Sequence, residues 1–247
     1  MSSSKMDSYD LQARHAPVVF AALPIILVAI ALMPELGQTK FQAGSIALLL
    51  LTALGFVATR LARSAGRSRQ ARLYAAWGGQ PTTAMLRSGD PRLNSQTKMI
   101  YRERLRRLGP MFPIPTEDEE RADSQGFDVK IGAAMDEVRR RAKERGIKRV
   151  HRENINYGAA RSAYGLKPYG LGACLVAAAA LTLAIYERGS FALSPLDIAV
   201  VMAITVIAAI WSLACTADRV RHHAEAYALE LFEAIELLVP PLRGRAA

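Results

Sequence analysis

Hydrophobic residues gather in four blocks along the chain. Two blocks lie near the N-terminus, at 16–33 and 43–59, and two near the C-terminus, at 169–186 and 196–215. Each holds roughly 17–20 residues, enough for a helix to cross a hydrocarbon core of about 30 Å. No Lys, Arg, Glu or His interrupts them, and Asp197 lies at an end. The pattern therefore predicts four membrane-spanning helices arranged as two hairpins.

The polar segment between the hairpins has the pattern of short helices. We expect helices at about 81–88, 95–108 and 127–145. Ser95 is the expected N-cap of the second of these helices. Thr116 and Glu119 have the spacing of a capping box, which predicts a helix start there. Since no alternating strand pattern of useful length is seen, the segment is predicted to be entirely helical.

The last predicted helix, at 216–239, has one apolar stripe. Its apolar residues recur at spacings of three and four, which places them on one face. Two interpretations stay open: the stripe packs against this chain's own helices, or it forms a seam between subunits of an oligomer. The residues of the expected seam are Tyr227, Leu231, Ile235 and Leu238.

Together these patterns predict an all-α integral membrane protein. Two transmembrane helical hairpins flank a basic cytoplasmic helical module, and an amphipathic helix follows at the C-terminus. The expected segments are 1–60, 61–168, 169–215 and 216–247.

Charge is distributed unevenly along the chain. The 247 residues carry a net charge of +10, and the mean hydropathy is still +0.11. Residues 60–168 hold 24 of the 32 basic and 12 of the 22 acidic residues, so this segment is +12 and the rest of the chain is −2. The positive-inside rule then places this segment and both termini in the cytoplasm. Two Cys within apolar blocks exclude a disulfide scaffold.

Recognisable catalytic motifs are absent from the sequence. There is no phosphate-binding Gly-rich loop and no Gly-x-Ser-x-Gly, and the four His are not spaced as a metal set. We expect no enzyme activity, no catalytic residues, no metal and no cofactor. The apolar blocks lack the ionisable groups of ion-coupled transporters, but a passive pore is allowed. Its lining hydroxyls would come from Thr52, Thr182, Thr205 and Ser212.

The basic segment has three candidate partners: anionic lipid, a nucleic acid or oligonucleotide messenger, and an acidic protein surface. Arg60, Arg63, Arg67 and Arg69, on the basic helix expected after the second apolar block, could reach lipid phosphates. The loop at 78–83 offers backbone N–H groups at a helix start, a typical anion site; the alternative is a plain helix break. The candidate ligand-binding residues are Trp77, Gly78, Gly79, Thr82, Arg87, Lys98, Arg102, Arg139, Arg140 and Arg141.

A resemblance bears on these alternatives. The stretch Ala76-Trp77-Gly78-Gly79-Gln80-Pro81-Thr82-Thr83-Ala84-Met85-Leu86-Arg87, followed by Asp90 and Lys98, resembles a motif of bacterial membrane proteins. The layout of hairpin, basic helices and hairpin is similar to the channel-forming effector of Hailong-type anti-phage defence systems, which is partnered with a nucleotidyltransferase. The second hairpin departs from the two-span effectors of other nucleotide-signalling systems. The resemblance implies a homo-oligomeric ion channel controlled by a nucleic-acid-like ligand.

We therefore expect an oligomeric pore in the bacterial inner membrane, with both termini cytoplasmic. It would be gated through the basic module by an oligonucleotide-like anion and would act in anti-phage defence. Its expected partners are further copies of itself, an oligonucleotide messenger from a nucleotidyltransferase, and anionic inner-leaflet lipid. The alternative is a non-channel membrane scaffold whose basic module binds anionic lipid or a protein partner.

Overall fold

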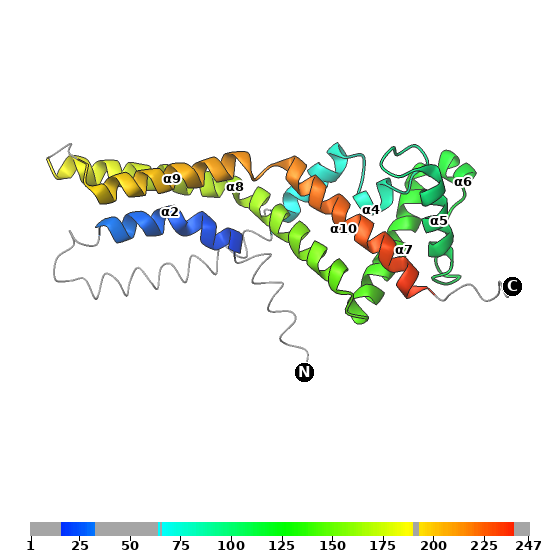
Figure 1. Ribbon diagram of the computed structural model, residues 1–247. Coiled ribbons are helices and arrows are strands. Elements are labelled where there is room, and N and C mark those ends of the chain that lie inside the picture. Colours follow the sequence, from blue (N-terminus) through cyan, green and yellow to red (C-terminus); the bar gives the residue numbers. More distant parts are fainter. Residues whose placement is uncertain (1–15, 33–63, 65, 190–192, 240–247) are drawn as a thin grey trace. The chain divides into compact units, whose positions relative to one another are not determined.

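The computed structural model describes residues 16–32, 64, 66–189 and 193–239. Every element in these ranges is a helix, which confirms the all-α prediction for this part of the chain (Figure 1). The helices are α2 (Ala16–Leu32), α4 (Pro81–Ala84), α5 (Ser95–Arg106), α6 (Glu117–Ala122), α7 (Ser124–Glu144), α8 (Lys148–Glu187), α9 (Pro195–Leu213) and α10 (Ala217–Leu238). Residues 66–76 are also helical.

The chain divides into two compact units, and each is described by itself. The apolar unit consists of Met1–Gln70 and Gly158–Val220. The polar unit consists of Ala71–Tyr157 and Arg221–Ala247. Most of the C-terminal amphipathic helix thus belongs to the same unit as residues 71–157.

Two helices, α8 and α9, are long and apolar enough to cross a membrane. They contain nearly all of the third and fourth apolar blocks. The first block forms α2, an apolar helix of 17 residues with Pro24 inside it. The second block, at 43–59, lies outside the described residues, so the prediction of four spans is tested only in part.

Helix α8 continues through Pro168 instead of stopping there. Proline has no N–H, so the carbonyl four residues earlier loses its helical partner. That carbonyl belongs to Tyr164, and Nη1 of Arg69 donates a hydrogen bond to it at 3.2 Å. The guanidinium of Arg69 also lies 5.5 Å from the centre of the Tyr164 ring. Arg69, from the helix at 66–76, therefore satisfies the backbone group that the proline leaves unbonded.

Close packing of α8 on α9 depends on Gly170. Trp211 of α9 is fully buried, and a Cβ atom built at Gly170 would lie 2.2 Å from its indole Cε2. Only a residue without a side chain lets the indole ring approach α8 this closely. The ring of Phe20 in α2 lies 5.4 Å from that of Trp211, so the tryptophan joins all three apolar helices.

An ion pair fixes the turn between α8 and α9. Ser194 and Asp197 form a capping box at the start of α9. Nη1 of Arg188 donates to both carboxylate oxygens of Asp197, at 2.8 and 3.1 Å. Asp197 is only 1% exposed. A buried carboxylate needs partners for its charge, and Arg188 and the capping box supply them.

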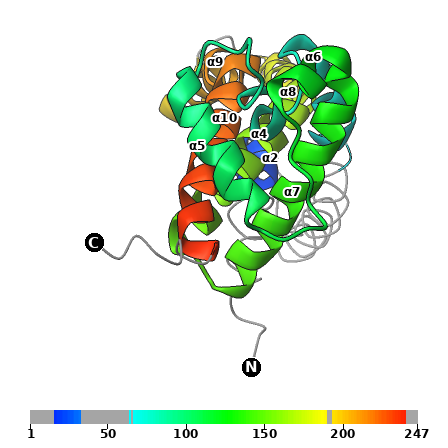
Figure 2. The same ribbon diagram turned by 90° about the vertical axis from the view of Figure 1, so that its right-hand side faces the viewer.

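The polar unit is built around α5, α7 and α10. Figure 2 shows α5 next to α10, where the Tyr101 and Phe232 rings stack at 5.2 Å. The Tyr157 and Tyr227 rings stack at 6.3 Å between α8 and α10. All four residues of the expected seam are buried within this single chain: Tyr227, Leu231, Ile235 and Leu238. Their burial favours the first interpretation of the stripe, packing within the chain; a seam through these residues has no exposed surface here.

Helix starts in the polar unit follow local side-chain chemistry. Thr116 and Glu119 form the expected capping box at the start of α6. At α5 the prediction was one residue late, since the cap is Asn94 and not Ser95. The Asn94 carboxamide accepts the N–H of Thr97 at 2.7 Å. Asparagine and serine are equally good caps, so composition alone does not choose between neighbours.

Candidate functional site

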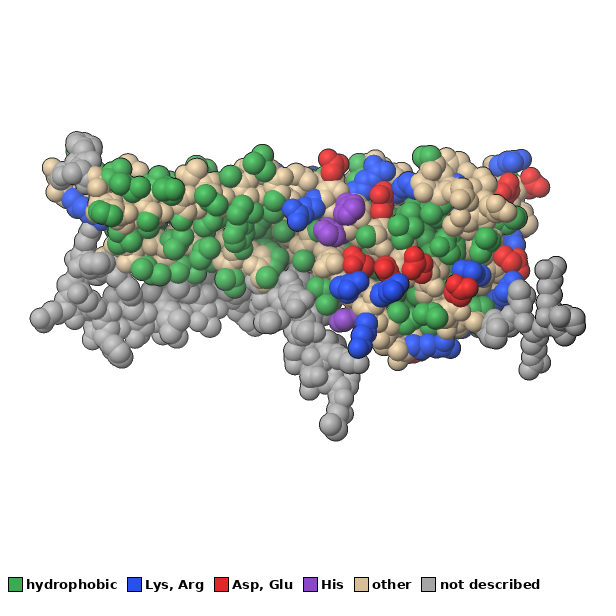
Figure 3. Space-filling model, viewed as in Figure 1, with side chains coloured by type: hydrophobic (Ala, Val, Ile, Leu, Met, Phe, Trp, Pro, Cys, Tyr) green, Lys and Arg blue, Asp and Glu red, His purple; other side chains and the backbone are tan. Residues whose placement is uncertain are grey.

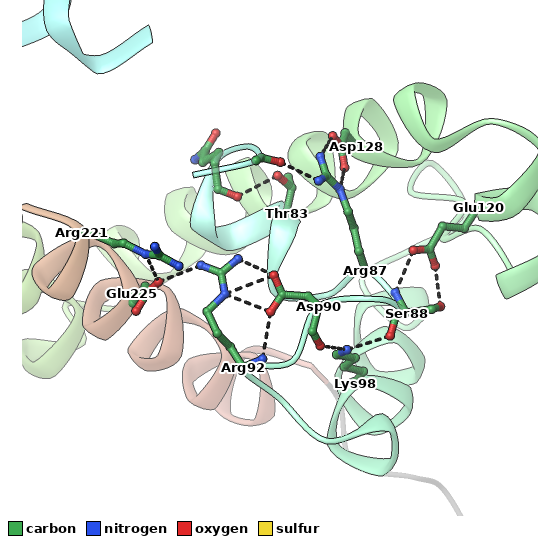
Figure 4. A network of polar contacts seen from close by, with 12 residues as sticks. Thr83, Arg87, Ser88, Asp90, Arg92, Lys98, Glu120, Asp128, Arg221 and Glu225 are labelled. Atoms are coloured by element: carbon green, nitrogen blue, oxygen red, sulfur yellow. Dashed lines mark hydrogen bonds and ion pairs between the residues drawn. The ribbon is translucent and has the colours of Figure 1, made fainter. Parts of the chain in front are cut away.

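The loop at residues 86–92, between α4 and α5, is the point where charged side chains of the polar unit converge. They come from α5, α6, α7 and α10 (Figure 4). The charged residues outside the loop that form hydrogen bonds with it are Lys98, Arg102, Glu120, Asp128 and Glu225. Side-chain hydrogen bonds to the 86–92 loop therefore connect helices that are distant in sequence.

A buried ion pair forms the inner part of this network. Nη2 of Arg102 lies 2.5 Å from Oε2 of Glu120, and their side chains are 6% and 9% exposed. Glu120 also accepts the backbone N–H and the hydroxyl of Ser88, each at 2.7 Å. Arg102 further donates to the Leu86 carbonyl and lies 4.7 Å from the Phe127 ring centre. Burial by itself raises the pKa of Glu120, but the bonds from Ser88 and Arg102 outweigh it and lower that pKa.

Lys98 bonds to backbone oxygens of the same loop. Its Nζ donates to the Ser88 carbonyl at 3.0 Å and also to the Asp90 carbonyl. The side chain is buried, with 4% of the residue exposed. Because the ammonium group is enclosed by protein oxygens, Lys98 fixes the path of the loop.

A second, more exposed chain of charges links the loop to α10. Arg92 pairs with Asp90 within the loop, and its Nη1 lies 2.8 Å from Oε1 of Glu225. Arg221 approaches the same oxygen at 2.9 Å. Burial raises the pKa of Glu225, but hydrogen bonds from Arg221 and Arg92 lower it overall. One carboxylate therefore holds two guanidinium groups, as Figure 4 shows.

Arg87 ties the glycine turn to α7. It forms a two-point ion pair with Asp128, with Nε 2.9 Å from Oδ1 and Nη2 bonded to Oδ2. Its Nη1 donates to the Gly78 carbonyl at 2.5 Å. This hydrogen bonding to Asp128 raises the pKa of Arg87, so it stays charged.

Several hydrogen-bonding groups of the expected anion site at the Gly78–Thr83 loop are used by contacts within the chain. The N–H groups of Thr83 and Ala84 both donate to the Gln80 carbonyl, and the Thr83 hydroxyl donates there too, at 2.9 Å. Gly79 donates to the Tyr74 carbonyl at 2.8 Å. Gly78 and Gly79 have φ angles of 77° and 134°, which favour glycine. This geometry is that of a helix break, the plainer of the two alternatives.

The other predicted ligand-binding residues near this loop contact their neighbours. Trp77 packs on Tyr74, with ring centres 5.9 Å apart. Thr82 is 3% exposed, and its hydroxyl has no partner among the described residues.

The arginine triplet lies along α7 and pairs within its own helix. Arg139 lies 2.6 Å from Asp136, and Arg140 bridges Glu137 and Glu144. Arg141 bonds Glu137 and also donates to the Leu108 carbonyl at 3.1 Å. Hydrogen bonds from Arg140 and Arg141 lower the pKa of Glu137 to about 2. Such exposed pairs contribute little stability, but they reduce the positive charge available to a ligand.

The structure thus brings Arg87, Lys98 and Arg102 around one loop and places the arginine triplet elsewhere, on α7. Their ligand-binding role stays a prediction, and for Lys98 and Arg102 it requires the loop to open. Three acidic partners, Glu120, Asp128 and Glu225, were not among the predicted site residues. Glu120 was visible only as part of an acidic helix start, and no spacing rule connects it to Arg102 or Ser88.

Acid is expected to destabilise the polar unit. The pKa values of Asp90, Glu120 and Glu225 are all lowered in the folded chain. A carboxylate with a lowered pKa adds stability that is complete above its unfolded pKa and lost as pH falls through its folded value. We therefore expect the thermal midpoint of the detergent-purified protein to be constant near neutral pH. At pH values below about 4.5 this midpoint should decrease. A midpoint that rises on acidification would contradict this assignment of charges.

The carboxylates of this network all have cationic partners. Each of its carboxylates is paired with an arginine, so none is placed to act as a free base. No group of three or more His, Cys, Asp or Glu residues that would suit a metal ion occurs in the described ranges. The comparisons give no family to which the chain can be assigned: no protein-family model, curated protein or solved structure matches it.

Proposed function

We propose that the protein is a membrane-embedded scaffold that holds a preformed helical module beside the membrane. The observation that carries this proposal is the exposed apolar surface of α8 and α9. In the most apolar 18-residue stretch of each helix, only 22% (α8) and 28% (α9) of the stretch is buried inside the protein. A core helix of a soluble protein is mostly buried. Figure 3 shows hydrophobic side chains along both helices. An exposed apolar surface of this kind suits lipid as its solvent.

The internal pairing of the polar unit supports a scaffold role. Arg87, Arg92 and Arg102 are bound to carboxylates of other elements. The 86–92 loop is therefore held in one conformation without a ligand. A module with a fixed surface suits the binding of a protein or lipid partner more than a reaction.

The second candidate is the oligomeric pore, gated by an oligonucleotide-like anion in the inner membrane of a bacterium. It is favoured by small residues on the surface of α8, where Ala178, Ala179 and Ala180 are exposed and Gly172 has open space. Such residues allow close approach of a second helix in a membrane. The hydroxyls of Thr182 and Thr205 donate to carbonyls of their own helices, at 2.9 and 2.8 Å, so in a pore they would act as acceptors. The scaffold is placed first because the 86–92 loop is held by ion pairs within the chain.

Membrane extraction and ion flux together test both candidates. We expect the expressed protein to stay in the membrane pellet after alkaline carbonate washing and to be released by detergent. Reconstituted in liposomes, it should carry no ion flux, with or without added short oligonucleotides. Release by carbonate would reject membrane embedding. Flux that appears with an oligonucleotide and is lost in Ala179→Leu, but not in Leu175→Ala, would replace the scaffold with the pore.

A further inference from the structure

Four basic residues of the apolar unit lack a carboxylate partner in the described part of the chain. Arg67, Arg69, Lys167 and Arg219, here called the basic cluster, have no acidic group within ion-pair distance among the described residues. The arginines of the polar unit, in contrast, are extensively paired with Asp and Glu. Asp218 is the one acidic residue of the described apolar unit outside the α8–α9 turn. Three members of the basic cluster belong to the positively charged segment 60–168, and the fourth, Arg219, follows α9.

Backbone packing brings the first two members against α8. A Cβ atom at Gly66 would lie 3.5 Å from the Arg161 carbonyl. The first turn of the helix at 66–76 therefore contacts α8 at Arg161. Nη1 of Arg161 donates to Gln70 at 2.7 Å, one turn further on. Arg69 bonds the Tyr164 carbonyl, and Arg67 is exposed two residues earlier on the same helix. Arg69 therefore contacts α8 at Tyr164, and Arg67 is exposed near the start of the helix at 66–76.

The other two members lie at the end of α9. Nζ of Lys167 donates to the Ser212 carbonyl at 2.9 Å, one of the last carbonyls of that helix. A cation is favourable there because the carbonyls at a helix C-terminus carry partial negative charge. Arg219 follows in the first turn of α10, where its backbone N–H donates to the Thr216 hydroxyl, and it is exposed. Lys167 thus contacts the end of α9, Arg219 follows that end, and Arg69 contacts α8 three residues before Lys167.

The height of the cluster along α8 matches the headgroup layer. The apolar stretch begins at Tyr169, which is 55% exposed. With a rise of about 1.5 Å per residue, Lys167 lies ~3 Å and Tyr164 ~8 Å before this point. Headgroup layers are roughly 5–8 Å thick on each side of the hydrocarbon core. Tyrosine is enriched at this boundary, and long basic side chains reach towards phosphates from it.

We propose that the basic cluster binds the phosphates of anionic phospholipids at the end of the α8–α9 hairpin. This inference rests on the proposed membrane embedding and names the ligand that the cluster takes. Lys167 and Arg69 each spend one donor on a carbonyl, and Arg67 and Arg219 have no side-chain partner among the described residues. The cluster therefore presents several N–H donors and net positive charge to the headgroup layer. Oligonucleotide binding is disfavoured here because Arg69 covers a face of the Tyr164 ring.

Lipid preference of the full-length protein tests this assignment. Protein is purified in detergent micelles containing equal amounts of phosphatidylglycerol and phosphatidylcholine, and bound lipid is counted by mass spectrometry. The double variant Arg67→Gln/Arg219→Gln removes two exposed charges that form no side-chain hydrogen bond or ion pair with described residues. We expect the preference for phosphatidylglycerol to fall at least about five-fold, since each basic residue near anionic lipid contributes about 1 kcal/mol.

The matched control is Lys130→Gln/Lys143→Gln, which removes two exposed charges from the polar unit. It should keep the wild-type lipid preference. An unchanged preference in the cluster variant, or an equal fall in both variants, would overturn the assignment. Loss of oligonucleotide binding with unchanged lipid preference would instead assign the cluster to nucleic acid. Carbonate extraction of the same variants keeps the two proposals separate, because a protein that stays embedded but shows no preference refutes only the lipid site.

Discussion

Glu120→Gln is expected to lower the free energy of unfolding of the polar unit by about 3–5 kcal/mol, the usual cost of removing one partner of a buried ion pair. The guanidinium of Arg102 would stay buried without its anion, while the hydroxyl and N–H of Ser88 would lose a charged acceptor. The thermal midpoint of the detergent-purified protein, followed by circular dichroism, should fall by about 10 °C or more.

Glu117→Gln is the matched control for this prediction. It neutralises a glutamate of the same helix whose side chain is 62% exposed and whose nearest cation, Arg121, lies 3.9 Å away. Its effect should stay within about 0.5 kcal/mol. Equal midpoints for both variants would show that the Arg102–Glu120 pair does not hold the polar unit together. A wild-type midpoint in the double variant Arg102→Met/Glu120→Leu would agree with the pair, because no unpaired charge is left buried.

Gly170→Ala is expected to destabilise the apolar unit by about 1–3 kcal/mol, the usual range for overpacking a filled core. The new methyl group would lie 2.2 Å from Cε2 of Trp211, and the neighbouring indole atoms are only slightly farther away. Trp211 is fully buried and cannot move aside into solvent. Trp211 fluorescence, recorded in a Trp77→Phe background during heating, reports this loss because the chain has two tryptophans.

Gly172→Ala serves as the control, since a Cβ atom there meets nothing within 4 Å. In a helix this change should be neutral or slightly stabilising. The clash can be checked by reducing the indole: Gly170→Ala should cost less when Trp211 is already leucine, as expected for two residues in contact. Equal effects at positions 170 and 172 would be evidence against close packing of α8 on α9.

The local features were predictable because they depend on neighbours in sequence. The capping box at Thr116 and Glu119 needs only four consecutive residues, and it is present as expected. The apolar blocks at 169–186 and 196–215 became helices because long apolar runs without breakers favour them. Even here the choice between Asn94 and Ser95 as a cap lay beyond the sequence rule.

The candidate site was predicted less completely, because its residues have two uses that look alike in sequence. Lys98 and Arg102 were predicted to be cations for a ligand, yet both are buried and bonded within the chain. Lys98 donates to the Ser88 and Asp90 carbonyls, and Arg102 bonds Leu86 and Glu120. The sequence around a basic residue on a helix does not show whether its partner is a phosphate or a buried carboxylate. The acidic partner lies 18 residues away from Arg102 along the chain, and no periodicity links the two.

By itself, the sequence determined the helical character of the described chain, the position of its apolar stretches and the excess of positive charge between them. These follow from hydrophobic periodicity and composition, which are local or additive quantities. Only the tertiary structure decided which charges are neutralised and which stay available. Ion pairs join segments far apart in the chain, so they depend on how helices pack. For this reason, the stripe of α10 is buried in the core, and the arginines near the 86–92 loop stabilise that loop. Four basic residues beside the apolar hairpin keep no carboxylate partner among the described residues.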